Sequence, residues 1–156
     1  MISVIIPIYN SEAYLKDLIN SLENQVYKDF EVIFIDDGSN DGSIEIIEKL
    51  QYETCLDIKI IKQENCGPSS ARNKGIDESS GELICFVDSD DVIHPLYLSN
   101  MFNDFMKFNA DIVICRQKAF SDSTMINNFE NSNLVKSYKI LTKEELLNGF
   151  LFNTIK

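Results

Sequence analysis

Leu83-Ile84-Cys85-Phe86-Val87 is an apolar run that ends abruptly in Asp88-Ser89-Asp90-Asp91. An apolar run of this length, bounded by turn residues, is typical of a buried β-strand. The carboxylates that follow lie close enough in the chain to repel one another unless a cation neutralises them. Carboxylate oxygens on a short loop suit Mg²⁺ or Mn²⁺, which share their coordination shell with substrate phosphates. The stretch therefore predicts a strand with a metal and phosphate site at its carboxyl end.

Strand-like and helix-like segments alternate along the rest of the chain. Apolar, β-rich runs predict strands at residues 3–8, 31–35, 58–61, 82–87 and 111–115. Apolar residues at helical spacing, together with capping residues, predict helices at about 14–22, 41–50, 67–77 and 95–106. This alternation predicts an α/β fold with a Rossmann-like, mainly parallel sheet that carries helices on both faces.

Length and charge limit the classes of ligand. A chain of 156 residues with 44% hydrophobic residues is long enough for one domain with a substantial core. The formal net charge of −11 argues against nucleic acid and against an anionic membrane surface, because both are bound through lysine and arginine. An acidic protein still binds a phosphorylated small molecule if a metal ion reverses the local field.

Targeting signals and cysteine usage point to the cytosol. The chain opens directly into a strand-like run, so we expect no secretion signal, and no apolar run is long enough for a transmembrane segment. Cys55, Cys66, Cys85 and Cys115 form no C-x-x-C pair. We expect buried thiols at Cys85 and Cys115 and a reduced state for all four. A Cys55–Cys66 disulfide is the alternative.

Unusual polar clusters follow three of the predicted strands. They cover residues 7–10, 36–39 and 88–91, and a fourth cluster at 65–73 spans a loop and the start of a helix. In an open parallel sheet, ligands bind beyond the carboxyl ends of the strands. We therefore expect these four clusters to converge on one edge of the sheet.

Each cluster contains a residue suited to a part of a nucleotide. Tyr9 offers a ring on which a base stacks, and Asp37 can accept a hydrogen bond from a base N–H such as that of uracil. The helix start after Gly67 presents backbone N–H groups, which together with Arg72 could bind a pyrophosphate. Asp88 and Asp90 would then hold the ribose and the metal.

Plain structural roles are the alternative for several of these residues. Tyr9 could pack over the sheet edge, Asp37 could serve a turn, and Arg72 could form a surface ion pair. His94 is expected to cap the helix at Pro95 rather than to act in catalysis. Close, uncompensated carboxylates such as Asp88 and Asp90 are the hardest to explain structurally.

Four motifs taken together resemble a known family. They are residues 3–10, 34–41, 65–76 and 88–91, and their order and spacing resemble those of family 2 glycosyltransferases, which have the GT-A fold. The resemblance covers roughly the first 115 residues. It implies a nucleotide-sugar-binding core at 1–115, followed at 116–156 by an irregular excursion and a helix that begin an acceptor-side region.

The resemblance also implies an activity and roles for single residues. It implies a metal-dependent, inverting glycosyltransferase of hexosyltransferase type that moves a sugar from a nucleotide-sugar, often a UDP-sugar, to a sugar or lipid-linked acceptor. Such an enzyme would build a polysaccharide or glycolipid in the cytoplasm or at the cytoplasmic membrane surface. Asp88 and Asp90 would be the catalytic D-x-D element, with Asp90 as the direct Mn²⁺ or Mg²⁺ ligand. The implied nucleotide-binding set is Pro7, Ile8, Tyr9, Asp37, Gly67, Arg72, Asp88 and Ser89.

The general base expected of an inverting enzyme is not identified. It usually lies well beyond the D-x-D element, and we interpret Glu144 and Glu145 as part of a helix-capping pattern instead. We therefore expect the chain to bind UDP with a divalent ion and to transfer sugar poorly, as the donor-binding half of a longer enzyme.

Other classes of protein share single features with the chain. A nucleotide-sugar-binding domain without turnover would need the same cleft. Residues 37–48 have the spacing of an EF-hand calcium loop, although a strand-like run precedes them where a helix is needed. Asp88 and Asp90 also match the first motif of haloacid-dehalogenase-like phosphatases, which that fold places on its first strand.

Overall fold

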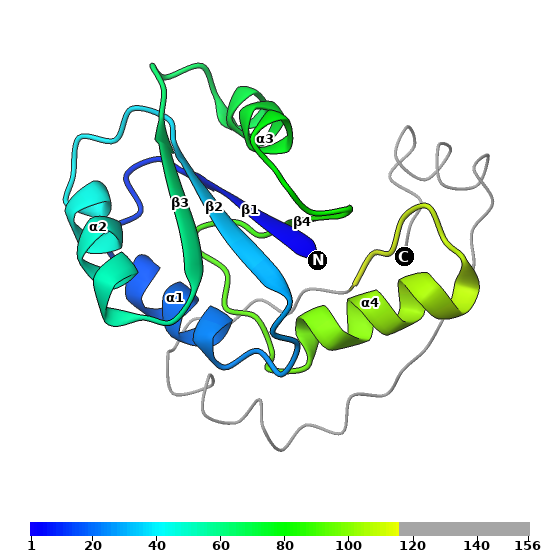
Figure 1. Cartoon of the computed structure of the whole chain (residues 1–156). Coiled ribbons are helices and arrows are strands. Elements are labelled where there is room, and N and C mark those ends of the chain that lie inside the picture. The colour runs from blue at the N-terminus through cyan, green and yellow to red at the C-terminus, as the bar shows by residue number, and fades with distance from the viewer. Residues whose placement is uncertain (116–156) are drawn as a thin grey trace.

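Four parallel strands form one sheet in the computed structural model, which describes residues 1–115 (Figure 1). The strands are β1 (Ile2–Ile8), β2 (Phe30–Asp36), β3 (Asp57–Lys62) and β4 (Leu83–Phe86), in the order β3-β2-β1-β4. Their ends differ by at most one residue from those predicted for the first four strands. The register pairs Ile8 with Asp36 and Asp36 with Lys62, so β1, β2 and β3 end at the same edge.

Helices cover both faces of the sheet, as predicted. They are α1 (Leu15–Glu23), α2 (Ser43–Glu53), α3 (Pro68–Asp77) and α4 (Tyr97–Phe108). α1, α2 and α4 contribute to the core on one face, and α3 packs on β1 and β2 from the other (Figure 1). The chain reverses direction across the sheet between β3 and β4. A right-handed crossover in the reverse direction must place its helix on the opposite face, which explains the position of α3.

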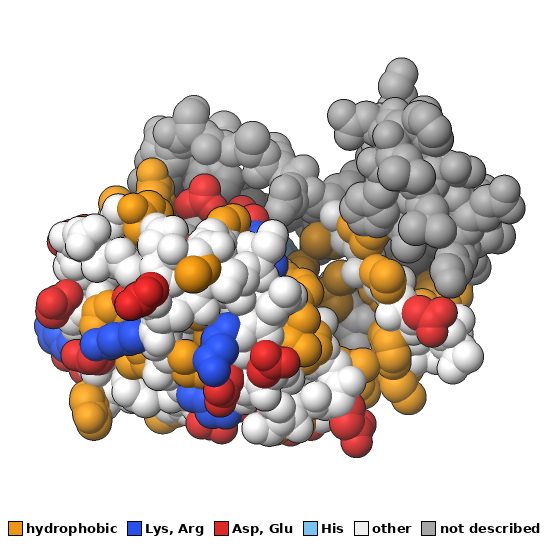
Figure 2. Space-filling model, turned by 90° about the horizontal axis from the view of Figure 1, so that it is seen from above, with side chains coloured by type: hydrophobic (Ala, Val, Ile, Leu, Met, Phe, Trp, Pro, Cys, Tyr) orange, Lys and Arg blue, Asp and Glu red, His pale blue; other side chains and the backbone are white. Residues whose placement is uncertain are grey.

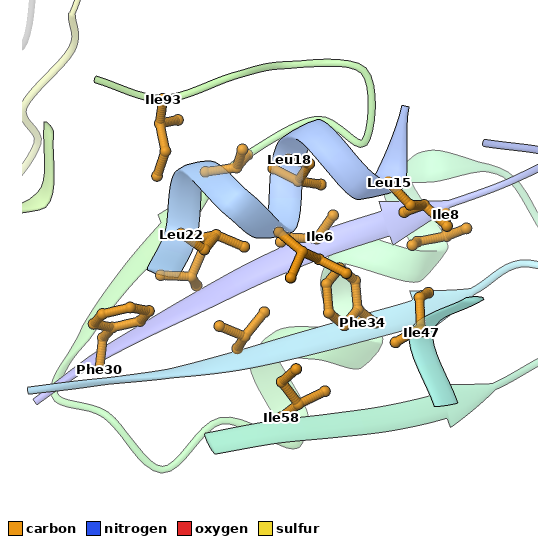
Figure 3. Packing of buried hydrophobic residues seen from close by; sticks show 14 of the residues in the cluster. Ile6, Ile8, Leu15, Leu18, Leu22, Phe30, Phe34, Ile47, Ile58 and Ile93 are labelled. Atoms are coloured by element: carbon orange, nitrogen blue, oxygen red, sulfur yellow. The ribbon is translucent and has the colours of Figure 1, made fainter. Parts of the chain in front are cut away.

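The larger core lies between the sheet and α1 (Figure 3). Ile6 and Ile8 alternate along β1 and face Leu15, Leu18 and Leu22, which recur at helical spacing along α1. All five side chains are completely buried. Burying an aliphatic side chain of this size contributes about 1.5–3 kcal/mol, so this layer supplies much of the stability of the fold.

The second face depends on close contact between α3 and β1. Ala71 and Ile5 belong to a small cluster with Ile33 and Ile35. Gly75 lies one turn further along α3, where an added Cβ would stand 2.3 Å from Ile5 Cγ2. A side chain at position 75 would therefore force α3 away from the sheet.

Gly75→Ala is expected to destabilise the fold by about 1–2 kcal/mol. Overpacking costs about 1–3 kcal/mol, of which alanine's better helix propensity recovers up to about 1 kcal/mol. Urea denaturation followed by circular dichroism measures the change. Asn73→Ala, at an exposed position of the same helix, is the control and should not destabilise. Equal stability of Gly75→Ala and the wild type would contradict the close packing.

Two predictions about strands are wrong. Residues 111–115 form no strand, and Ile112 and Ile114 are 60% and 59% exposed. A strand requires a ladder with a neighbour, and none of residues 1–115 pairs with this segment. β4 is not fully buried either, because α3 covers β1 and β2 and leaves Ile84 and Phe86 exposed. The predictions for residues 116–156, including the capping pattern at Glu144 and Glu145, lie outside the described residues.

The four cysteines are free thiols, and Cys55 and Cys66 are not paired. Cys85 is half-buried, and burial raises its pKa to about 11. The prediction of a buried Cys115 is wrong, because this residue ends the segment that forms no strand and is exposed.

No helix within residues 1–115 combines the length and apolar character needed to cross a membrane. The face in Figure 2 carries acidic and basic side chains side by side, so the net negative charge is not segregated there.

Candidate functional site

The four predicted clusters meet at one edge of the sheet. They border a cleft of about 510 Å³ at the carboxyl ends of β1, β2 and β4 and at the start of α3. Its lining residues are Pro7, Ile8, Tyr9, Asp37, Asn65, Gly67, Pro68, Arg72, Asp88, Ser89 and Asp90. All the residues predicted to bind nucleotide or metal are in this set. Asn65 and Pro68 belong to the cluster at 65–73 but were not predicted as site residues.

The strand order explains why the cleft lies here. The connections from β1 run toward β3 on one side, whereas β4 lies on the other side of β1. The direction in which the chain moves across the sheet therefore reverses at β1, next to β4. Such a reversal point is the usual ligand site of open parallel sheets.

Asp37 holds the loop that leads into α3. The residue is buried, and its Oδ1 accepts hydrogen bonds from Cys66 N–H at 2.8 Å and Gln63 Nε2 at 2.7 Å. Its Oδ2 accepts one from Gly67 N–H at 2.8 Å. Burial alone would raise the pKa of Asp37, but these three hydrogen bonds outweigh burial and lower it. Since a carboxylate has about four acceptor positions, one remains on Oδ2 for a ligand.

The start of α3 is prepared for an anion. Gly67 has φ +87°, a left-handed conformation that favours glycine, and Pro68 occupies the first helical position. The N–H groups of Cys66 and Gly67 are bound to Asp37, whereas those of Ser69 and Ser70 have no partner within residues 1–115. These two N–H groups and the positive end of the helix dipole favour a phosphate near Gly67 and Pro68.

Arg72 forms an ion pair with Asp88. Its Nη2 lies 2.6 Å from Asp88 Oδ1, and the two side chains are 33% and 50% exposed. The surface ion pair considered as an alternative for Arg72 is therefore present, but it lies in the cleft. Arg72 keeps further N–H donors and Asp88 keeps Oδ2, so both retain groups for a ligand.

Asp90 is the least constrained acidic residue in the cleft. Residues 88–91 form a turn in which Asp91 N–H donates to Asp88 C=O at 3.1 Å. The Asp90 carboxylate is exposed and makes no hydrogen bond or ion pair within residues 1–115. Partial burial raises the pKa of Asp91, and the negative charges of Asp88 and Asp90 raise it further. The turn thus creates a negative local field that favours a cation.

The described residues supply only part of a metal shell. No group of three or more His, Cys, Asp or Glu side chains suited to a metal ion is assembled within residues 1–115. Mg²⁺ and Mn²⁺ bind through one or two carboxylates when substrate phosphates and water complete the shell. Asp88 and Asp90 fit that arrangement, with the start of α3 across the cleft for the phosphates.

Tyr9 and His94 clarify two of the open alternatives. Tyr9 is 51% exposed and lines the cleft, so its ring is not simply packed into the sheet edge. His94 does not line the cleft, and its Nδ1 accepts the N–H of Leu96 at 3.1 Å, just before α4. The N-cap of α4 is Leu96, and no side chain makes a capping hydrogen bond there, so the prediction that His94 caps this helix is wrong.

The side chains expected to bind calcium at residues 37–48 do not face a common point. Asp41 Oδ1 accepts hydrogen bonds from Ser43 N–H and Oγ at the start of α2, and Asp37 faces the cleft. Glu48, the expected last ligand, forms an ion pair with Lys62 at 3.0 Å. The EF-hand alternative is therefore wrong, because its ligands are committed to three different places.

Comparison with known proteins identifies the family. The family model "Glycosyl transferase family 2" matches residues 3–153. The chain belongs to this family. The match confirms the resemblance drawn from the four motifs, and it removes the phosphatase alternative, whose motif belongs on a first strand rather than on β4.

Relatives and solved structures of this family cover most of the chain. The glycosyltransferase GlyA of Streptococcus pneumoniae is 39% identical over 122 residues, which is 78% of this chain and 17% of GlyA. The crystal structure of S. aureus TarS 1–349 in complex with UDP is 38% identical, with a TM-score of 0.65, over 70% of this chain and 33% of that chain.

A third structure contains a metal ion. Glucosyl-3-phosphoglycerate synthase from Mycobacterium tuberculosis in complex with Mn²⁺, UDP and glucosyl-3-phosphoglycerate is 25% identical, with a TM-score of 0.53. The match covers 68% of this chain and 39% of that chain. The chain thus spans well under half of the length of each of these proteins.

Proposed function

We propose that residues 1–115 bind the nucleotide-sugar donor of a glycosyltransferase, with UDP as the nucleotide. The observation that carries this proposal is a cleft that joins a half-exposed ring, a buried carboxylate, a helix start and the 88–91 turn. The UDP complex of the TarS structure supports the choice of nucleotide. The reaction is the transfer of a hexosyl group from the donor to a sugar or lipid-linked acceptor.

The cleft residues divide the donor among them. The Tyr9 ring stacks on uracil beside Pro7 and Ile8, and the remaining acceptor position on Asp37 Oδ2 receives the uracil N–H. The start of α3 at Gly67 and the guanidinium of Arg72 bind the diphosphate. This leaves the ribose between these two ends, within reach of Asp88 and Ser89.

A divalent cation, Mn²⁺ or Mg²⁺, is part of the proposal. Asp90 would hold it directly and Asp88 would support it, as the Mn²⁺ complex of glucosyl-3-phosphoglycerate synthase makes reasonable. When bound, the cation supplies Lewis-acid stabilisation of the charge that develops on the leaving UDP. The chain's own residues orient the diphosphate.

The acceptor side of the reaction is proposed to lie outside residues 1–115. An inverting mechanism needs a base at the acceptor hydroxyl, and no cleft residue is assigned that role. We expect this chain to bind UDP and to transfer sugar poorly. Efficient turnover by the 156-residue chain would contradict this part of the proposal. Synthesis of a polysaccharide or glycolipid on the cytoplasmic side is the setting we propose.

Calorimetric titration with UDP, with and without MnCl₂, tests the proposal. The wild type is expected to bind UDP more tightly with Mn²⁺. Tyr9→Ala should weaken binding by about 1–3 kcal/mol because a base loses its stacking partner. Tyr14→Ala is the matched control, since this tyrosine is 53% exposed and lies outside the cleft. Wild-type protein that does not bind UDP, or equal losses in both variants, would contradict the proposal.

A further inference from the structure

A hydroxyl pair connects the loop after β1 to the 88–91 turn. Ser11 follows β1 and is 4% exposed. Its Oγ lies 2.7 Å from Ser89 Oγ, and its N–H donates to Ser43 Oγ at 2.9 Å. Ser11 therefore joins three segments that are far apart in the chain: the ends of β1 and β4 and the start of α2.

Ser11 is itself held firmly by the loop after β2. The loop at 10–12 and the loop at 39–42 exchange hydrogen bonds in both directions. The bonds are Asn10 N–H to Ser39 Oγ (3.0 Å), Asn40 N–H to Asn10 Oδ1 (2.8 Å), Glu12 N–H to Asp41 Oδ2 (3.1 Å) and Gly42 N–H to Glu12 Oε2 (3.0 Å). A residue anchored in this way can hold a partner in place.

Two further contacts of the 88–91 turn involve Asp88. Asp88 is bound by Arg72, and Asp91 N–H closes the turn on Asp88 C=O. Asp90 makes no bond of its own within residues 1–115, so its position follows from that of its neighbours. Ser89 is the neighbour on the amino side, and its side-chain partner is Ser11.

We infer that Ser11 is a positioning residue, whose hydroxyl holds Ser89 and thereby fixes the turn that presents Asp90 to the cleft. The inference rests on the proposed function, in which Asp90 binds the cation. Either hydroxyl can be the donor in the Ser11–Ser89 hydrogen bond. When Ser11 donates to Ser89, the Ser89 O–H is free to donate to an oxygen in the cleft. When Ser89 donates instead, Ser11 can donate to Tyr9 C=O at 3.4 Å. A bound anion supplies an acceptor and favours the first arrangement.

Hydrogen exchange in the ligand-free chain tests the hold on the turn. Ser11→Ala is expected to speed exchange of the Asp91 amide about tenfold, because the turn that protects this amide loses an anchor. Ser3→Ala is the control. Ser3 is also buried and its hydroxyl bonds Glu31 and Gly81 N–H, but it lies at the other end of β1. Ser3→Ala should not speed exchange of the Asp91 amide beyond what its loss of global stability accounts for.

UDP titration with and without Mn²⁺ tests the consequence for the cation. Ser11→Ala should reduce the metal-dependent gain in UDP affinity about fivefold, with metal-free affinity unchanged. Ser89→Ala should reduce the same metal-dependent gain and also lower metal-free affinity, because Ser89 lines the cleft. The metal-dependent gain of the double variant should be no smaller than that of the poorer single variant, because both changes remove one interaction.

The outcomes separate the inference from the proposed function. Unchanged Asp91 exchange together with an unchanged metal-dependent gain in Ser11→Ala would overturn the inference and leave the proposed function standing. Additive losses in the double variant would also overturn it. A wild type without metal-dependent UDP binding, combined with faster Asp91 exchange in Ser11→Ala, would overturn the proposed function while supporting the hold of Ser11 on the turn.

Discussion

Asp90→Asn is expected to abolish the gain in UDP affinity that Mn²⁺ provides, a loss of at least about tenfold, or ~1.4 kcal/mol. The carboxylate of Asp90 is exposed in the cleft and has no competing partner within residues 1–115, so a cation is its natural counter-charge. An amide keeps the shape of the side chain but lacks the charge that a hard cation requires. Calorimetric titration of UDP in MnCl₂ and in EDTA measures the gain.

Without metal, the same substitution is expected to change UDP affinity in the opposite direction. UDP is an anion, and Asp90 repels it when no cation is present. Asp90→Asn should therefore bind UDP slightly more tightly than the wild type in EDTA. Asp57→Asn is the charge-matched control, because Asp57 is exposed at the opposite end of the strands. A metal-dependent gain that survives in Asp90→Asn would refute the assignment of this residue as the metal ligand.

Asp37→Asn is expected to reduce both stability and UDP affinity. Asp37 is buried and receives three donors, from Gln63, Cys66 and Gly67. In asparagine one oxygen becomes an NH₂ group, which turns a donor toward a donor. An unsatisfied buried group costs about 1–3 kcal/mol, and release of the loop before α3 also displaces the phosphate site. Urea denaturation and UDP titration measure the two effects.

Asp41→Asn provides a closely matched control for Asp37→Asn. Asp41 also accepts two backbone N–H groups, from Glu12 and Ser43, and one side-chain donor, and its pKa is likewise lowered. Asp41 lies outside the cleft. Both variants should therefore lose stability, whereas only Asp37→Asn should lose UDP affinity. Equal affinity losses would mean that stability, and not the cleft, accounts for the effect.

The lowered pKa of Asp37 also predicts how stability depends on pH. Because the folded-state pKa lies below its ordinary value of 3.8, the ionised side chain stabilises the fold fully above that value. This contribution decreases as the pH falls below about 4 and through the folded-state pKa. The stability difference between wild type and Asp37→Asn should therefore shrink between pH 7 and pH 3. A difference that grows toward acid pH would contradict the role of the carboxylate.

The period of the apolar residues determined most of the fold. Alternating or continuous apolar runs and helical spacing located β1 to β4 and α1 to α4 because burial on one face is a local property of the pattern. The general rule for parallel sheets then placed Tyr9, Asp37 and Asp88 at one edge, and the structure brings them to one cleft. The same pattern wrongly predicted a strand at 111–115, since an apolar run does not show whether a neighbouring strand is available.

Only the tertiary structure decided how the side chains in the cleft are paired. Arg72 binds Asp88, Asp37 binds the loop before α3, and Ser11 binds Ser89 across 78 positions of the chain. None of these partners is close in sequence, and each arises because the sheet places strand ends side by side. The residue types predicted a polar cleft. Hydrogen bonds between distant segments decide which carboxylates are held, and they leave Asp90 without a partner within residues 1–115. The reason is that periodicity shows which side of a helix or strand is buried. A contact between two elements depends on how the whole chain arranges them in space.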